Sequence, residues 1–182
     1  MGNPAYTNFV TEYEESRRWV PVLQRVLGPY VLREANLDED RTQATDMILL
    51  KANGLRVACR VRGCTGRSYE KKYAYDVTIT CRRESGASCE WDKMIVGGMA
   101  DWFFYGHALN GHDIAPWYIV DLAIARPWFL AFPGPEISNR DAPGRRCFFH
   151  VFDVNRMRVA LGGKCLIGAR WPAPTVALGS AR

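Results

Sequence analysis

Three runs rich in apolar and β-branched residues follow one another along the first half of the chain, and they predict three successive β-strands. They occupy residues 45–51, 55–63 and 73–83. Between the first two runs, Asn53-Gly54 supplies the positive φ angles that a tight hairpin turn needs. A period of two along the second run puts its cations on one face, namely Arg56, Arg60 and Arg62, together with Ala58. The pattern therefore predicts a hairpin with a cationic face, followed by a third strand.

The remaining pattern predicts helices and strands around this hairpin. Aromatic and apolar residues at steps of three and four predict an amphipathic helix over residues 4–19. Further helices are expected from Pro21 to Gly28, over residues 89–100 and over residues 126–132. Further strands are expected at residues 101–109 and 117–125. From residue 147 onward we expect a strand, a turn at Asp153–Asn155 and a second strand.

This order predicts an α/β to α+β fold, with a central mixed β-sheet flanked by helices. Helix, three strands, helix and strand form the expected core. At 182 residues and 48% hydrophobic content, the chain is expected to form a single domain over 1–182. Its expected parts are a core at about 4–132, a loop at 133–146, a C-terminal β-hairpin extension at 147–168 and a weakly ordered tail at 169–182.

Charge is concentrated in the strand region. The chain has 24 Lys and Arg against 19 Asp and Glu, which gives a net charge of +5. Residues 56–83 carry most of the candidate cations, namely Arg56, Arg60, Arg62, Arg67, Lys71, Lys72, Arg82 and Arg83. Arginines on one strand face repel one another unless anions lie against them, and guanidinium groups match phosphate oxygens well. A nucleic-acid backbone is one such anion. Internal carboxylates are the alternative, with Asp46, Asp76, Glu90 and Asp101 as candidates.

The sequence also predicts a cytoplasmic location. The first residues are polar and acidic, unlike a secretory signal. The six cysteines form no CxxC pair, so we expect reduced thiols rather than disulfides or a zinc site. The longest apolar run, at about residues 94–105, is too short for a membrane span. No membrane partner is therefore expected.

The stretch from Asp46 to Arg62 resembles the PD-(D/E)xK, or restriction-endonuclease-like, nuclease superfamily, which includes Holliday-junction resolvases. Asp46 stands at the head of a strand, Asn53-Gly54 forms the turn, and Arg60-Val61-Arg62 occupies the place of the acid-x-Lys triplet. The triplet acid is missing here. Arg62, in the place of the lysine, stays protonated and cannot act as a base.

The resemblance implies a nuclease-like hydrolase that cuts DNA phosphodiesters with Mg²⁺ or Mn²⁺. Asp46 would bind the metal, and Asp76 or Glu90 would complete the site. Arg60 and Arg62 would hold the scissile phosphate. The nucleic-acid-binding cations are expected to be Arg56, Arg67, Lys71, Lys72, Arg82, Arg83 and Lys93.

The alternative is a non-catalytic binding protein on the same fold. Such a protein binds nucleic acid or, like small phage or other virus-encoded effectors and inhibitors, a host protein. A protein partner and a homodimer are both compatible with the sequence. His107 and His112 are further candidates for acid–base or metal-binding roles, and a strand-capping role is the alternative for His107.

Overall fold

The computed structural model describes residues 14, 17–27, 32–34, 47–49, 55–63, 73–109, 113–139, 146–162 and 166–168. At 26–27, 32–34, 47–49 and 166–168 the description covers the backbone alone. Asp46, Arg67, Lys71, Lys72 and His112 lie outside the described residues, as do most of the predicted helix 4–19 and the tail 169–182.

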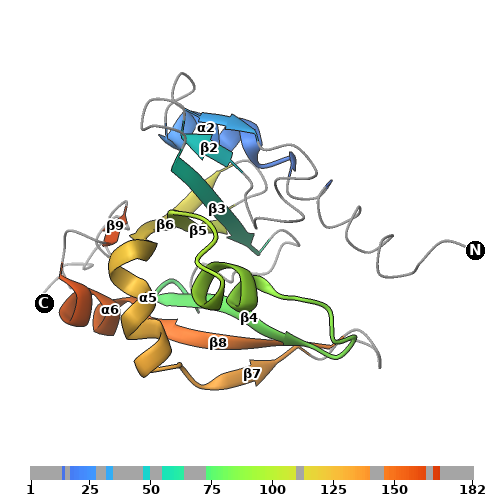
Figure 1. Ribbon diagram of the computed structural model, residues 1–182. Helices are drawn as coiled ribbons and strands as arrows, with labels where there is room; N and C mark the ends of the chain where they lie inside the picture. Colours follow the sequence, from blue (N-terminus) through green and yellow to red (C-terminus); the bar gives the residue numbers. More distant parts are fainter. Residues whose placement is uncertain are drawn as a thin grey trace, which may run out of the picture.

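Strands outnumber helices along the described chain (Figure 1). In chain order they are α2 (Val20–Leu27), β1 (Leu32–Glu34), β2 (Met47–Leu49), β3 (Leu55–Arg62), β4 (Asp76–Arg83), the π-helix η1 (Trp91–Val96), β5 (Trp102–Ala108), β6 (Ile114–Asp121), α5 (Leu122–Ala131), β7 (Glu136–Ser138), β8 (Cys147–Asp153), α6 (Val154–Leu161) and β9 (Leu166–Gly168).

The described strands form two sheets. The larger sheet has the order β1-β2-β3-β5-β6-β9, and the smaller one has the order β4-β8-β7. Strands β3 and β5 run parallel, and the other pairs in the larger sheet are antiparallel. The larger sheet is therefore mixed and has flanking helices, which confirms the predicted α/β to α+β class. The predicted hairpin is present, because β2 pairs antiparallel with β3.

The third predicted strand, β4, does not lie beside β3. Strand β5 takes that place, with Val57 opposite Trp102, and β4 pairs with β8 instead. From Phe103 to Ala108 every residue of β5 is buried, which suits the interior of a sheet better than the half-polar β4 does. The expectation that Asp76 lies on a strand next to the hairpin is therefore wrong.

The two faces of the larger sheet pack against different partners. On one face, Val57 and Phe104 join Trp19 and Leu23 of the α2 region in a buried cluster. The opposite face contributes Ala58 and other residues to the main core, which also contains β4, η1, α5 and α6 residues. The predicted alternation along β3 is thus confirmed, and its arginine face is turned toward the second sheet.

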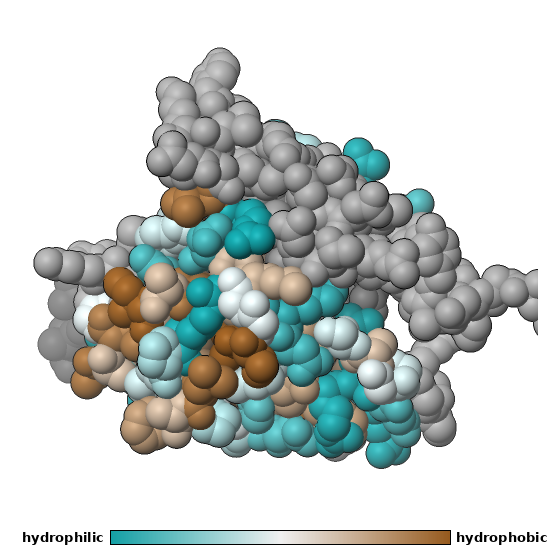
Figure 2. Space-filling model, in the orientation of Figure 1, coloured by the Kyte–Doolittle hydropathy of each residue, from teal (hydrophilic) through white to brown (hydrophobic). Residues whose placement is uncertain are grey.

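Helix α5 begins within the stretch that the sequence predicts as a strand. Asp121 caps it, because its carboxylate accepts a hydrogen bond of 2.9 Å from the Ala123 amide. The second half of the predicted strand 117–125 is therefore wrong. Helix α5 is apolar on its exposed side as well, where Ile124, Leu130 and the following Phe132 are 49%, 52% and 62% exposed. Figure 2 shows apolar side chains gathered where α5 and α6 lie. Because apolar residues lie on both the buried and the exposed side of α5, its sequence does not show the 3.6-residue hydrophobic period of an amphipathic helix.

The C-terminal region also differs from its prediction. Strand β8 is present, but the second strand of the expected hairpin is the helix α6. The Asp153 carboxylate accepts a hydrogen bond of 2.8 Å from the Arg156 amide, which starts this helix. Phe152 and Met157 are buried in the main core. Strand β8 and helix α6 therefore contribute to the core, and the predicted loop 133–146 contains β7.

No helix in the described part of the chain is both long and apolar enough to cross a membrane.

The predicted helix 89–100 is reduced to the π-helix η1, and Arg126 of α5 holds the end of that helix. Its guanidinium donates to the carbonyl oxygens of Met94 at 2.7 Å and Met99 at 3.0 Å, and also to that of Ala100. Burial lowers the pKa of Arg126. One side chain thus satisfies three carbonyl groups in and after η1.

Replacing Arg126 with alanine should lower the free energy of unfolding by about 2–4 kcal/mol, because three carbonyl groups lose their donor. Arg126→Lys should recover part of the loss, since an ammonium group cannot span all three carbonyls. Urea unfolding measures the change. Arg158→Ala, an exposed α6 position, is the control and should stay within about 0.5 kcal/mol of wild type. Equal effects at both positions would contradict this role of Arg126.

Candidate functional site

A cavity of about 220 Å³ lies where the end of β3 faces the smaller sheet. Its polar wall comes from both sheets and from the residues next to them, namely Arg62, Tyr73, Asp76, Thr78, Tyr105 and Asn139. Its apolar wall comes from β7 and β8, namely Ile137, Phe149 and Val151. The cavity thus combines one guanidinium and one carboxyl group with hydroxyl, amide and aromatic groups.

Arg62 is the cation of this cavity, and it lies at the end of β3. Its guanidinium carbon is 4.9 Å from the centre of the Phe149 ring, within the range of a cation–π contact. It also acts on the neighbouring titratable groups, because it opposes the rise in the pKa of both Asp76 and Tyr105. Arg62 therefore favours negative charge in the cavity, against the effect of burial.

Asp76 is the acid of the cavity. Burial raises its pKa, the nearby Asp153 raises it further, and Arg62 opposes both. Asp76 and Asp153 are directly opposite each other in the β4–β8 pair, so their side chains lie on the same face. Asp76 therefore keeps a proton more readily than an ordinary aspartate, and in that form it can donate as well as accept a hydrogen bond.

His107 is buried beside this cavity, inside β5. Its side chain is inaccessible to solvent, and its two ring nitrogens have no hydrogen-bond partner. Burial and the nearby Arg62 lower its pKa to about 4, whereas a contact with the Asp76 backbone acts in the opposite direction. The ring is therefore neutral at pH 7. The strand-capping role of His107 stays a prediction.

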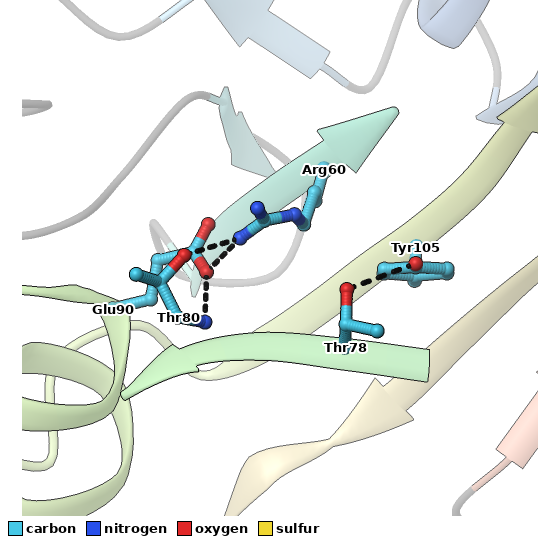
Figure 3. A network of polar contacts seen from close by, with 5 residues as sticks. All are labelled: Arg60, Thr78, Thr80, Glu90 and Tyr105. Carbon is cyan, nitrogen blue, oxygen red and sulfur yellow. Dashed lines mark hydrogen bonds and ion pairs between the residues drawn. The ribbon is translucent and has the colours of Figure 1, made fainter. Parts of the chain in front are cut away.

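Arg60 and Glu90 form a polar network that joins the two sheets (Figure 3). Arg60 of β3 donates to the Thr80 hydroxyl at 2.8 Å and pairs with the carboxylate of Glu90. The same carboxylate accepts a hydrogen bond of 2.8 Å from the Thr80 amide. The side chains of Arg60 and Glu90 are only 19% and 28% exposed. This pair neutralises one group that the sequence assigns to the scissile phosphate, Arg60, and one that it assigns to the metal, Glu90.

The metal prediction requires Asp46, Asp76 and Glu90 to meet. The Glu90 carboxylate is held at Thr80 of β4. Asp76 lies four residues before Thr80 on this strand, which puts the two positions about 13 Å apart along β4. Carboxylates that share one Mg²⁺ each lie about 2 Å from it, so Asp76 and Glu90 do not fit a common cation. The described residues contain no group of three potential metal ligands. A site built on Asp46 stays a prediction.

The structure describes four of the predicted nucleic-acid-binding cations, Arg56, Arg82, Arg83 and Lys93, and acids pair with the first two. Arg56 pairs with Asp101, with 3.5 Å between guanidinium and carboxylate. Arg82 pairs with Glu136 at 2.9 Å and stacks over the Phe148 ring at 3.4 Å. Arg83 continues β4, and Lys93 lies on η1. The internal-carboxylate alternative thus holds for Arg56 and for Arg60.

No protein-family model, curated protein or solved structure matches this chain. The resemblance to PD-(D/E)xK nucleases therefore stays a prediction. Four cysteines are described, Cys59, Cys81, Cys89 and Cys147, and all are free thiols. The guanidinium group at the cavity can bind an anion, and the hydroxyl and amide groups there can form hydrogen bonds with polar groups.

Sequence reasoning missed most of the cavity wall. Tyr73 is the first residue of the predicted strand 73–83, Asn139 lies in the predicted loop 133–146, and Phe149 lies in the predicted C-terminal extension. Thr78 could have been found, because a period of two along β4 puts it on the same face as Asp76. No pattern in the sequence shows that β8 faces Arg62.

Glu90→Ala should lower the free energy of unfolding by about 2–3 kcal/mol, because it leaves Arg60 and the Thr80 amide without their acceptor. Denaturant unfolding measures the loss. Glu136→Ala, which removes the exposed partner of Arg82, is the matched control and should change stability much less. A Glu90 variant as stable as the Glu136 variant would show that the network contributes nothing to the fold.

Stability should fall as the pH drops from 6.5 towards 4, partly because of His107. The unfolded chain binds this proton near the ordinary pKa of 6.5, whereas the native chain binds it only near 4, so acid favours unfolding. His107→Phe keeps the ring and removes the proton site, and should flatten this part of the profile. Urea unfolding of both proteins across this range is the measurement. If the stability of the two proteins changed equally with pH, His107 would not contribute to the loss of stability in acid.

Proposed function

We propose that the chain is a nucleic-acid-binding protein whose contact site is the cavity at the end of β3. The observation that carries the proposal is Arg62 lying over the Phe149 ring in the cavity wall. A guanidinium group there can bind a phosphate oxygen, and the aromatic groups around it suit a base. The predicted cations Lys71 and Lys72 directly precede Tyr73 of the cavity wall in the sequence, which supports an anionic ligand.

Binding without cleavage is favoured over catalysis by the Arg60–Glu90 pair. A cation that holds a scissile phosphate and a carboxylate that holds a metal each need an open coordination position. Here Arg60 and Glu90 bind each other and Thr80. This supports the non-catalytic alternative on the same fold.

Metal-dependent cleavage of DNA is the second candidate function. The observation that favours it is the β2–β3 hairpin, with Met47 opposite Val57, which is the hairpin that the nuclease resemblance requires. Asp46 directly precedes β2 in the sequence and would bind Mg²⁺ or Mn²⁺. A homodimer, a host-protein partner and a cytoplasmic location also stay predictions.

Fluorescence anisotropy with labelled single-stranded and duplex DNA at about 50 mM salt tests binding. Arg62→Ala should weaken binding several-fold and reduce the salt slope by about 1, because it removes one phosphate contact. Arg25→Ala is the control, since Arg25 lies on α2, which covers the other face of the larger sheet. An Arg62 variant that binds like wild type would exclude the cavity as the contact site.

Incubation with supercoiled DNA and Mg²⁺ or Mn²⁺ separates the two candidate functions. Binding without cleavage is the expected outcome. Cleavage that is lost in Asp46→Ala would establish the second candidate instead. The absence of any binding at low salt would overturn both.

A further inference from the structure

We propose that the cavity at the end of β3 holds one unpaired base, so that the protein selects single-stranded over duplex nucleic acid. This inference rests on the proposed function and names its ligand more closely. It depends on the size of the cavity, on its aromatic wall and on its polar wall.

The size of the cavity limits its ligand to something small. Its volume is about 220 Å³, which is below the range of about 300–1,000 Å³ that is usual for small-molecule sites. A duplex cannot enter such a space, whereas one flat heterocycle can. The phosphates on either side of that base would remain outside, where Arg62 reaches the surface at the last position of β3.

The aromatic wall suits the face of a base. Phe149 of β8 is 7% exposed, and the guanidinium carbons of Arg60 and Arg62 lie 5.1 Å and 4.9 Å from its ring centre. Arginine and aromatic planes are the groups on which single-stranded bases stack. Arg60, which Glu90 holds in place, contacts the Phe149 ring from outside the cavity lining and so supports this wall.

The polar wall suits the edge of a base. Thr78 lies beside Tyr105, with 3.1 Å between their hydroxyl oxygens, and the Asn139 amide and Asp76 carboxyl complete this side. Hydroxyl, amide and carboxyl groups provide both donors and acceptors, as the Watson–Crick edge of a base requires. In a duplex that edge is already paired and the faces are stacked, so a base must leave the helix to bind here.

Three fluorescein-labelled probes of equal length, about 12 nucleotides, test the inference. They are a single strand of mixed sequence, its blunt duplex, and an abasic strand with the same phosphates and no bases. Wild type should bind the normal strand about tenfold more tightly than the other two. Anisotropy titration measures the three affinities.

Ser138→Leu provides the matched variant, because Ser138 is an exposed β7 residue that lines the cavity, and a leucine there narrows it. Ser88→Leu is the control, with the same change at an exposed residue in the loop before η1. Ser138→Leu should weaken binding of the normal strand to the level of the abasic strand. Ser88→Leu should leave all three affinities unchanged. Circular dichroism melting establishes that both variants fold.

The outcomes separate this inference from the function it rests on. Equal binding of normal and abasic strands by wild type, or preference for the duplex, overturns the base site and leaves nucleic-acid binding intact. This comparison needs no variant. Tighter binding of free dAMP than of the strand also overturns the inference, because the cavity would then serve a nucleotide. Failure to bind all three probes overturns the proposed function as well.

Discussion

A guanidinium group keeps its proton inside a protein, so an arginine on an inward strand face needs an anion beside it. Arg60 meets this constraint through Glu90, which lies 30 positions away in the chain. The same carboxylate accepts a hydrogen bond from the amide of Thr80 on β4, which among the described strands has a neighbour on one side only. Glu90 thus neutralises Arg60 and accepts a hydrogen bond from a backbone amide of β4. The two sheets are held together at this point, and the cavity lies farther along β3, at Arg62.

Much of the fold follows from local patterns. The strands β3, β4 and β5 and the helix α2 lie close to where the hydrophobic pattern predicts them. Helix α5 begins at Leu122, four residues before the predicted helix 126–132, because its apolar first turn was interpreted as the end of a strand. Helix α6 was missed because Asp153 was interpreted as part of a turn. Both helices begin at an aspartate that caps them, a signal that the sequence does contain. The sequence pattern could not predict that β5, and not β4, pairs with β3. This pairing depends on which of two strands, distant from each other in the chain, forms the better partner for the edge of β3.

The site could be predicted only in part. Alternation along β3 correctly puts Arg56, Arg60 and Arg62 on one face. It cannot show that the first two pair with Asp101 and Glu90, while the third lies beside an aromatic ring of β8. Three similar arginines therefore have different roles, and the difference comes from what other segments place against each of them. The family resemblance rests on Asp46, a position that the described residues do not reach.

The parallel pairing of β3 with β5 has a consequence for how the chain folds. The connection between them, residues 63–101, contains β4, whose own partner begins only at Cys147. During synthesis, the hairpin can form and β3, β5 and β6 can pair while β4 still lacks its neighbour, because these strands precede β8 in the chain. Sheet pairings between such distant segments close slowly. In that interval an unpaired strand edge is exposed, so nascent chains should be most prone to aggregate before β8 leaves the ribosome.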